Sequence, residues 1–377
     1  MIKKLLVKLT PYDRFFFGGK NTFGEGGSAN YFVKSKYFPQ QTTLLGLVRY
    51  QLMVQNSKGV FKNNKIENKD EAAKLISRKS FEITDNEFDF GKIKEFSPVF
   101  IAGENEEYLF PANKEYQRVE ENNKFVMREF NKQAGSSSIY STSLKHFIPY
   151  LEGYVAKDGL PDLLINVDKK LCKYDDIFIE HKQIGIRKDY YGKTEEKAFY
   201  IQFFYKLKKG CSFAFILELE DGINFSSNEL VNIGGEQSKF KMDVSRMPDE
   251  FDKLLPCYEP SKNSGKVVLV SNAYVSNKIF EDCDFAATDI IDFNSIVTTQ
   301  NTTKFSSMSQ TGKEANGDNN DKLRKSGQSI FFKRGSVFYA DDASKLIAHI
   351  GKTEKKEYTP LQKIGYNHFR IVNQKES

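Results

Sequence analysis

The chain has 377 residues, which is enough for two domains of ordinary size. Hydrophobic residues make up 39% and charged residues 28%, a composition typical of globular proteins. No apolar run approaches the roughly 18–20 residues that a membrane-spanning helix requires. The N-terminal stretch has lysines inside its apolar run and no small-residue cleavage site, so we expect no signal peptide and a cytoplasmic location.

Cysteine and histidine, the residue types that build most zinc and disulfide sites, are few and scattered. No Cys-x-x-Cys pair and no His-Glu-x-x-His arrangement occurs. We therefore expect free thiols, no metal and no cofactor. The cysteines are Cys172, Cys211, Cys257 and Cys283, and the histidines are His146, His181, His349 and His368.

Charge is unevenly distributed along the chain, although the net charge is only +6. Residues 1–50 carry +6, residues 181–210 carry +5 and residues 301–336 carry +4, which leaves −9 for the remainder. Basic segments on an acidic remainder are consistent with one face for a polyanion and another for protein partners. Solvated charged faces would give the same pattern, so both interpretations stay open.

The N-terminal region has the pattern of a strand, a glycine loop and a helix. The segment Ile2–Leu9 is rich in β-compatible residues and ends before a Thr-Pro pair, which predicts a strand. Five glycines follow within residues 18–27, a density that requires backbone of positive φ or a close approach. Apolar residues then recur at helical spacing over 44–52, with Thr42 or Thr43 as the expected N-cap.

The middle of the chain is polar, with short segments of regular structure. A short helix is expected around residues 70–78, and short strands within 81–112. The segment Gln-Ala-Gly-Ser-Ser-Ser at 133–138 predicts a mobile loop, and a helix is expected over Leu144–Leu151.

Three runs of strand length follow one another from residue 176 onward. The link between the first two, residues 187–197, is basic, contains two tyrosines and is long for a hairpin turn. It is interpreted either as a protruding contact element or as an ordinary surface excursion.

The C-terminal third contains further strand and helix signals. Gly234-Gly235 lies between an apolar turn and a strand-like run, and residues 266–271 predict a strand. Residues 329–340 predict two short strands, followed by a helix that begins at Asp342. Residues 296–328 are dominated by Thr, Asn, Ser, Gly and Lys, which predicts a flexible loop.

The sequence offers little support for catalysis. It has neither a Gly-x-Ser-x-Gly elbow nor a Gly-x-x-x-x-Gly-Lys-[Ser/Thr] phosphate loop. A metal-free ribonuclease would use a general acid or base, most often a histidine, and His181 on a predicted strand is the best candidate. An exposed strand histidine without a catalytic role is the more common case, so we expect no enzymatic activity and no catalytic residues.

RNA binding requires different groups, namely cations, backbone amides and helix N-termini for phosphates, and aromatic platforms for unstacked bases. The chain has glycine loops beside strands at Gly18-Gly19-Lys20 and Gly234-Gly235, and a basic loop with tyrosines at 187–193. Each signal is weak alone. The first glycine loop could be a simple turn, and Arg49 on the first helix could form a surface ion pair.

The order of these signals resembles the repeat-associated mysterious proteins (RAMPs) of CRISPR systems. The family opens with a strand, a glycine loop and a helix whose start carries Phe-Pro, threonine, glycine and arginine, and these positions are matched here by Phe38, Pro39, Thr42, Thr43, Gly46 and Arg49. The segment Glu-His-Lys-Gln-Ile-Gly-Ile at 180–186 resembles the third Cmr subunit of type III-B complexes. Residues 232–242 resemble the family's glycine-rich loop, and residues 332–340 resemble its C-terminal Gly-Ser-Val-aromatic strand.

The resemblance implies an α+β fold of two ferredoxin-like (RRM-like) domains with loop and β-hairpin insertions. The first would span residues 1–245, with insertions at about 55–145 and 187–197, and the second residues 246–377, with its flexible loop at about 296–328. It also implies a non-catalytic subunit that holds the 5′ handle of the CRISPR guide RNA (crRNA). Its partners would be the large polymerase-type subunit and the neighbouring RAMP backbone and small subunits.

Carried over position by position, the resemblance implies a set of RNA-binding residues. The family usually has an arginine directly after the glycine-rich loop, whereas here Gln237, Ser238 and Lys239 follow, and lysine lacks the bidentate fork of arginine. The implied residues are Gly18, Gly19, Lys20, Thr42, Thr43, Arg49, Gly185, Arg187, Lys188, Lys193, Gly234, Gly235, Glu236 and Lys239.

Three alternatives remain open at this point. The equivalent subunit of a type III-A or III-D complex shares the strand–loop–helix opening. A guide-processing endoribonuclease of the RAMP fold would use His181 or a Tyr/Lys substitute. A structural scaffold would make no RNA contact.

Overall fold

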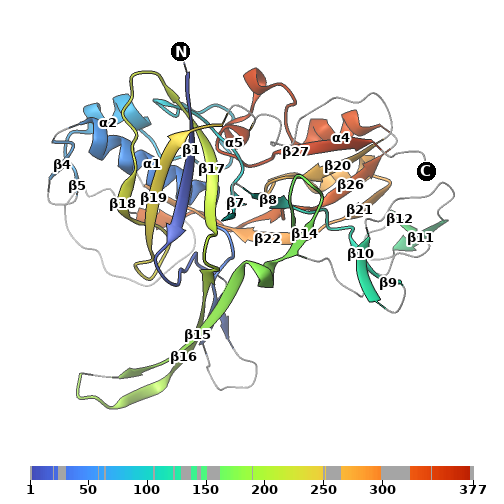
Figure 1. Cartoon of the computed structure of the whole chain (residues 1–377), viewed down its shortest axis with the longest axis horizontal. Helices are drawn as coiled ribbons and strands as arrows, with labels where there is room; N and C mark the ends of the chain where they lie inside the picture. Colours follow the sequence, from blue (N-terminus) through green and yellow to red (C-terminus); the bar gives the residue numbers. More distant parts are fainter. Residues whose placement is uncertain are drawn as a thin grey trace, which may run out of the picture.

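The structure is a computed structural model, and it shows a mixed α/β chain built mostly of strands (Figure 1). Among the described residues, no helix is long and apolar enough to cross a membrane. The structure describes residues 2–19, 21–23, 31–57, 59–62, 65–104, 107–121, 124–128, 137–141, 146–150, 162–188, 190–248, 251, 265–298, 323–340 and 342–373.

The largest sheet has nine strands, and the predicted N-terminal strand lies near its centre. That strand, β1 (Ile2–Pro11), pairs antiparallel with β17 (Ser212–Glu220) on one side and β19 (Lys239–Arg246) on the other. The order is β14-β13-β8-β7-β17-β1-β19-β18, with β6 also paired to β17. The remaining strands are β6 (Ile93–Phe96), β7 (Phe100–Ala102), β8 (Tyr108–Pro111), β13 (Leu163–Ile165), β14 (Leu171–Lys173) and β18 (Asn228–Asn232).

The two faces of this sheet bury alternate residues of its central strands. Successive strand side chains point to opposite faces. Leu5, Val7 and Leu9 therefore join the main core, whereas Leu6 joins a smaller cluster on the other face. The main core is covered by α1 (Gln41–Asn56), which buries leucines at the predicted helical spacing, and α2 (Lys69–Ile76) packs beside α1. Both helices confirm the sequence predictions.

Two predictions about this region are wrong. Gln40, and neither Thr42 nor Thr43, is the N-cap of α1, and its side chain makes no capping bond. The expected helix over 144–151 is a strand, β12 (His146–Tyr150), paired with β11 (Ser137–Ser141). Pro149 explains the second error, because proline has no backbone N–H to donate inside a helix. Two other small hairpins are β4 (Phe61–Lys62) with β5 (Lys65–Ile66) and β9 (Gln117–Glu121) with β10 (Lys124–Arg128).

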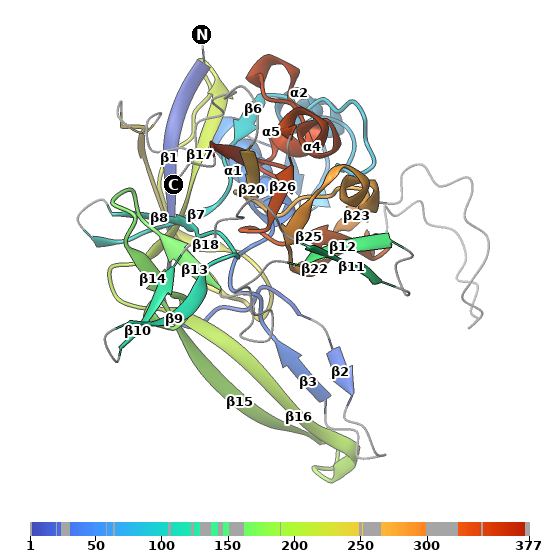
Figure 2. The same cartoon turned by 90° about the vertical axis from the view of Figure 1, so that its right-hand side faces the viewer.

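A long two-stranded arm projects away from the large sheet (Figures 1 and 2). Its strands are β15 (Phe178–Lys188), which follows the 3₁₀ turn Tyr174–Asp176, and β16 (Thr194–Leu207). Two short strands extend the sheet, because β3 (Tyr31–Lys34) runs parallel to β16 and β2 (Asn21–Phe23) pairs with β3. The link between β15 and β16 covers only residues 189–193, so it is shorter than the predicted 187–197.

The C-terminal part has its own sheet and helix. The sheet order is β21-β26-β20-β27, and α4 (Ala343–Ile350) packs on β20 and β26. Asp342 caps α4 by accepting a hydrogen bond from the Ser344 amide, as predicted. Its strands are β20 (Gly265–Leu269), β21 (Phe285–Ala287), β26 (Val337–Ala340) and β27 (Phe369–Asn373), and small ladders join β22 (Ile290–Phe293) to β25 (Ser329–Phe332) and β23 (Ile296–Thr298) to β24 (Leu323–Lys325).

The C-terminal part also contributes to the main core of the N-terminal part. Short helix α5 (Pro360–Lys363) packs near β6, and Ile364 and Tyr366 belong to the same hydrophobic cluster as α1. The Tyr366 hydroxyl accepts a hydrogen bond from the Gln41 amide at 3.1 Å. At the start of α1, the partner of a backbone amide is thus a distant tyrosine hydroxyl, whereas the sequence predicted a local threonine cap. The domain boundary at residue 245 stays a prediction.

Candidate nucleic-acid interface

The segment Phe15–Phe17 connects the two glycine loops to the base of the arm. Phe15 exchanges two backbone hydrogen bonds with Tyr205 of β16, at 2.7 and 3.2 Å. The next carbonyl, that of Phe16, accepts a bond of 2.7 Å from the Gly235 amide. The Phe16 amide donates to the hydroxyl of Ser238 at 3.0 Å. Residues far apart in the sequence therefore meet at one place.

The glycines in these loops are required by close approaches within the chain. Gly234 has φ +83°, and a Cβ there would lie 2.5 Å from the Phe16 carbonyl oxygen. A Cβ on Gly19 would overlap the carbonyl of Lys34, and Gly18 has φ +71°. The Gly18 carbonyl accepts a hydrogen bond from the Lys36 amide at 2.9 Å. The Gly235 amide is bonded to the Phe16 carbonyl, so it is not available to bind a phosphate.

The outer surface of both loops is nevertheless open to solvent. Gly19, Gly234, Gly235, Glu236 and Lys239 are all exposed. Glu236 has φ +54° and Gln237 φ +53°, so the turn holds two non-glycine residues in the left-handed region. Such backbone turns expose peptide dipoles and admit a close neighbour, and Lys239 adds a cation at the start of β19.

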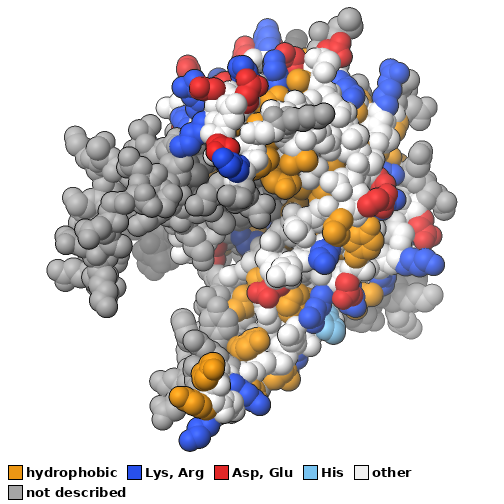
Figure 3. Space-filling model, turned by 90° about the vertical axis from the view of Figure 1, so that its left-hand side faces the viewer, with side chains coloured by type: hydrophobic (Ala, Val, Ile, Leu, Met, Phe, Trp, Pro, Cys, Tyr) orange, Lys and Arg blue, Asp and Glu red, His pale blue; other side chains and the backbone are white. Residues whose placement is uncertain are grey.

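The arm presents apolar and basic side chains together (Figure 3). Ile184 and Ile186 on β15 are exposed, and at the tip Tyr190 and Tyr191 are 97% and 84% exposed. Lys188 and Lys193, which flank the tip, are exposed as well. Exposed aromatics between cations are the combination that holds single-stranded nucleic acid through stacking and phosphate contact. β15 also forms one edge of its sheet.

Gly185 has a packing role on this arm. It lies opposite Tyr200 in the β15–β16 ladder, and a Cβ at Gly185 would lie 2.1 Å from the Tyr200 ring. The tyrosine ring therefore lies across the strand at this position. Gly185, Arg187 and Lys188 all lie on β15, which is an edge strand of this sheet.

At the base of the arm several cations lie on aromatic rings or pair with acids. The Arg14 guanidinium lies 4.4 Å from the Phe204 ring centre. Lys34 pairs with Glu180 at 2.8 Å, and this contact raises the pKa of Lys34. Lys206 pairs with Asp13 at 2.5 Å and lowers the pKa of that carboxyl. Because the side chains of both pairs are largely exposed to solvent, each pair contributes little to the stability of the fold.

The predicted helix residues lie elsewhere. Thr42 and Thr43 are half-buried in the first turn of α1, and Thr42 is hydrogen bonded to the Tyr366 hydroxyl. Arg49 packs 5.4 Å from the Phe88 ring, and burial lowers its pKa to about 10. Arg49 is therefore not a solvent-facing cation like those of the arm. Lys20 and the side chain of Arg187 lie outside the described residues.

The described histidines do not form a catalytic constellation. His181 is exposed on β15. His349 contacts Asp282 at 2.8 Å, and His368 is buried with its pKa lowered to about 4 by desolvation. The side chain of His146 lies outside the described residues. Among the residues that the structure describes, no three His, Cys, Asp or Glu side chains gather in a metal-binding group.

Sequence reasoning did not identify Phe16 and Ser238 as the link between the loops, because that contact joins positions 222 residues apart. It also did not identify Ile184 and Ile186 as exposed. The signal available for those two was the alternation in the β15 segment, which places them on one face of an edge strand.

A family of known proteins matches the sequence over residues 7–374. This family is described as CRISPR-associated protein (Cas_Cmr3). The chain belongs to the Cas_Cmr3 family. The resemblance to the third Cmr subunit of type III-B complexes, carried by four short motifs, is confirmed. No curated protein matches the sequence of this Cas_Cmr3 chain.

This Cas_Cmr3 chain is also similar to chains in solved structures. A chain in a cryo-EM structure of the type III-B Cmr-β bound to cognate target RNA is 16% identical with a TM-score of 0.50, and the match covers 98% of this chain and 99% of that chain. A second such structure, with target RNA and AMPPnP, matches at 16% identity over the same shares with a TM-score of 0.47. The Csm3–Csm4 subcomplex of a type III-A complex matches at 11% over 94% and 96%, with a TM-score of 0.33. At these identities the first likeness shows a shared fold.

Proposed function

We propose that this chain is a non-catalytic crRNA-binding subunit of a type III-B CRISPR effector complex and that it holds the 5′ handle of the guide. The observation that carries the proposal is the meeting of the arm, the Gly18 loop and the Gly235 loop at the Phe15–Phe17 segment in a member of the Cas_Cmr3 family. The structural likeness to a chain of a target-RNA-bound Cmr complex supports it.

In this proposal the surface works by position. Exposed lysines of the arm, Lys182, Lys188 and Lys193, would contact phosphates, which carry most of the affinity and no sequence information. Tyr190 and Tyr191 at the tip would stack on splayed bases and so separate the handle from the guide. Base pairing elsewhere in the complex would then read the target, as in other RNA-guided effectors.

We further infer that the chain contains two ferredoxin-like domains with insertions. The central strands β1, β17 and β19 with α1 would be the first, and the sheet of β20, β21, β26 and β27 with α4 the second. The acidic remainder of the chain would face protein neighbours, with the large polymerase-type subunit as one partner.

Crosslinking of the native complex tests the proposal directly. Ultraviolet irradiation is expected to join handle nucleotides to peptides from 14–19, 178–207 or 231–239. A Lys182→Glu/Lys188→Glu variant should lower the guide content of the purified complex, whereas Lys345→Glu on the exposed face of α4 should not. Handle crosslinks that avoid all three peptides, with unchanged guide content in the double variant, would show that the handle is held elsewhere.

The non-catalytic part of the proposal has its own test. A His181→Ala variant is expected to assemble with guide RNA of the same length and ends as the wild type. Guide RNA that keeps unprocessed repeat sequence in this variant would instead support the endoribonuclease alternative, in which His181 acts as general acid or base.

A further inference from the structure

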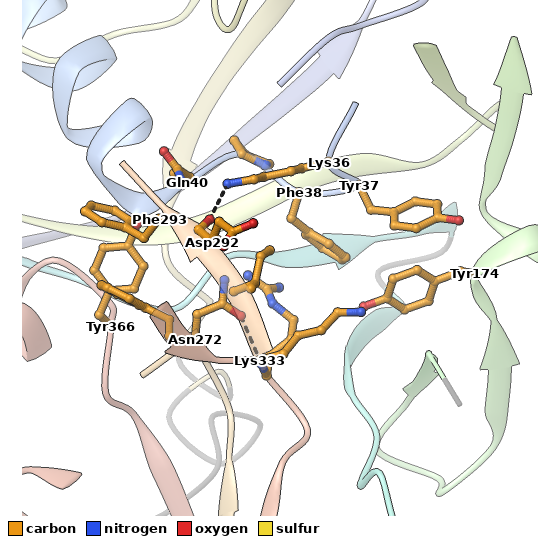
Figure 4. Close-up of a pocket in the computed structure, with 14 residues that line it drawn as sticks. Lys36, Tyr37, Phe38, Gln40, Tyr174, Asn272, Asp292, Phe293, Lys333 and Tyr366 are labelled. Atoms are coloured by element: carbon orange, nitrogen blue, oxygen red, sulfur yellow. Dashed lines mark hydrogen bonds between the residues drawn. The ribbon is translucent and has the colours of Figure 1, made fainter. Parts of the chain in front are cut away.

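A small hollow lies between the segment that follows β3 and the C-terminal part of the chain (Figure 4). Its volume is about 110 Å³. One side is formed by residues 36–40, and the opposite side by residues 291–293 of β22 together with Phe331, Lys333 and Arg334. A single buried water needs about 10–15 Å³ of such space, so the hollow has room for a chemical group as large as several waters. This size suits one heterocyclic ring and excludes a drug-sized ligand, which needs about 300 Å³ or more.

Aromatic rings form the floor of the hollow. Phe38, Phe293, Phe331 and Tyr366 are each at least 90% buried, and all of them line it. Phe293 and Phe331 stack at 4.5 Å between ring centres, and Tyr366 meets Phe331 edge-on. Rings fixed against one another in this way give a rigid apolar wall suited to a flat aromatic group.

The rim and walls of the hollow carry three cations. Arg334 is 7% exposed, and its guanidinium lies 4.2 Å from the Phe38 ring centre and donates to the Val99 carbonyl at 3.0 Å. Lys333 is held by Asp162 at 2.6 Å and Asp289 at 3.3 Å. Lys36 donates from its ammonium to the backbone carbonyl of Asp292 at 2.8 Å.

One acidic residue, Asp292, lines the hollow beside these cations. Its carboxylate accepts a hydrogen bond of 2.8 Å from the side chain of Gln328. The hydrogen bond from the Lys36 ammonium to Asp292 goes to the backbone carbonyl, which carries no charge. Burial lowers the pKa of Lys36 to about 8, which an anionic group nearby would raise.

The hollow adjoins the proposed RNA surface. The amide of Lys36, on its rim, donates to the Gly18 carbonyl at 2.9 Å. Tyr37, the next residue on the rim, stacks at 4.2 Å on Tyr205, which is bonded to Phe15 at the base of the arm. A strand held along the glycine loops would therefore pass beside the opening with its phosphates near Lys36.

We propose that this hollow receives one unstacked nucleobase of the RNA strand, with the phosphate of that nucleotide beside Lys36. The inference rests on the proposed function, because the RNA is the strand held by the arm and the glycine loops. A base is flat and aromatic and is joined to an anion, which matches a ring-walled hollow with cations at its rim and one carboxylate already engaged. The side-chain amide N–H of Asn272, whose carbonyl oxygen already accepts a hydrogen bond of 2.9 Å from the Arg334 amide, would meet the polar edge of the base.

Base-reactivity footprinting of the assembled complex tests the inference. In the wild type, one base of the bound RNA is expected to be protected from dimethyl sulfate or carbodiimide. Ile291→Phe, which puts a ring into the hollow from a lining position, should make that base as reactive as in the free strand. Ile290→Phe is the matched control, because Ile290 is the neighbouring residue, is 59% exposed and does not line the hollow.

A second variant covers the case in which Ile291→Phe fails to fold. Lys36→Met removes the rim cation and is expected to raise the reactivity of the same base, while Lys345→Met should not. Hydroxyl-radical cleavage of the same samples reports whether the RNA backbone is still held. If the backbone is protected but no base is, or if both hollow variants leave the protected base unreactive, the hollow is not a base site although RNA binding stands.

Two further outcomes also separate the possibilities. An RNA backbone that is unprotected over the handle in the wild type would refute the proposed function itself. Titration of the isolated chain with AMP and with UMP distinguishes a free nucleotide from a base in a strand. Saturable mononucleotide binding that Ile291→Phe abolishes, in a complex whose handle bases are all reactive, would assign the hollow to a free nucleotide and overturn the inference.

Discussion

The ammonium of Lys266 lies 2.6 Å from the carboxylate of Glu115, and the two side chains are 2% and 0% exposed. Lys266 is in β20 of the C-terminal sheet, and Glu115 follows β8 of the large sheet, so this buried pair joins the two parts of the chain. Asn113 donates to the same carboxylate at 3.0 Å. A buried charge that loses its partner is strongly destabilising, whereas replacing both partners by apolar groups is often tolerated.

We therefore expect Lys266→Met to lower the free energy of unfolding by about 3–5 kcal/mol. The double variant Lys266→Met/Glu115→Leu should recover much of that loss, because no unpaired charge stays buried. Urea unfolding of the single and double variants measures both values. A single variant within about 1 kcal/mol of the wild type would mean that water reaches the pair and that it is not the buried junction described here.

Two glycines are expected to respond to alanine with opposite signs. Gly234→Ala should destabilise the chain by about 1–3 kcal/mol, because φ is +83° and the new methyl would collide with the Phe16 carbonyl. Gly46→Ala should stabilise it by about 0.5–1 kcal/mol, because Gly46 is an exposed position inside α1 with no atom within 4 Å of a Cβ. Thermal unfolding of both variants checks the signs, and a stabilised Gly234→Ala would contradict the close contact between the loops.

Glu95 is expected to make the fold less stable as the pH rises. Burial raises its pKa to about 7, against the partial compensation of Lys355 at 3.0 Å. The folded state therefore binds more protons than the unfolded state between about pH 4.5 and 7, and stability falls over that window. Glu95→Gln should raise the free energy of unfolding by about 1–3 kcal/mol at pH 8 and change it little near pH 4. An equal effect of the substitution at both pH values would argue against a raised pKa.

His368 is expected to make the fold more stable as the pH rises. Desolvation lowers its pKa to about 4, so the unfolded state binds more protons between about pH 4 and 6.5, and stability rises with pH there. In the wild type, the rise of stability with pH that His368 causes opposes the fall that Glu95 causes. A His368→Phe variant should lose the rising part, so its stability should fall more steeply from pH 4.5 to 6.5 than that of the wild type. The comparison of slopes is unaffected by the loss of the bond from His368 to the Gln362 carbonyl. Parallel curves for the two proteins would show that His368 titrates normally.

The salt dependence of RNA binding should identify the arm lysines that contact phosphate. Each lost phosphate contact reduces the slope of log affinity against log salt by about 0.7 for a single strand. Lys182→Ala and Lys188→Ala are each expected to reduce the slope by that amount, and Lys345→Ala, on α4, to leave it unchanged. Filter binding of a single-stranded RNA at several salt concentrations measures the slopes. Slopes that match the wild type in both arm variants would place the phosphates elsewhere.

The sequence by itself determined the elements whose signals are local. The strand at Ile2–Leu9, the helices α1, α2 and α4, the Asp342 cap and the strands β15, β16 and β17 follow from periodicity and capping chemistry within one segment. The order of short motifs was also sufficient to indicate the family, because each motif is a run of neighbouring residues. The errors in this category have local causes too, since Pro149 is incompatible with the helix interior expected over 144–151.

Only the tertiary structure decided what surrounds those elements. The hydroxyl of Tyr366 accepts a hydrogen bond from the Gln41 amide at the start of α1, although the two residues are 325 positions apart, so no threonine cap was needed. The two glycine loops meet through Phe16 and Gly235, and the hollow is closed by Phe38 from one end of the chain and Phe331 from the other. Hydrophobic burial is non-directional and depends on the whole core, so a sequence pattern shows that a phenylalanine is buried but not which distant residue packs against it.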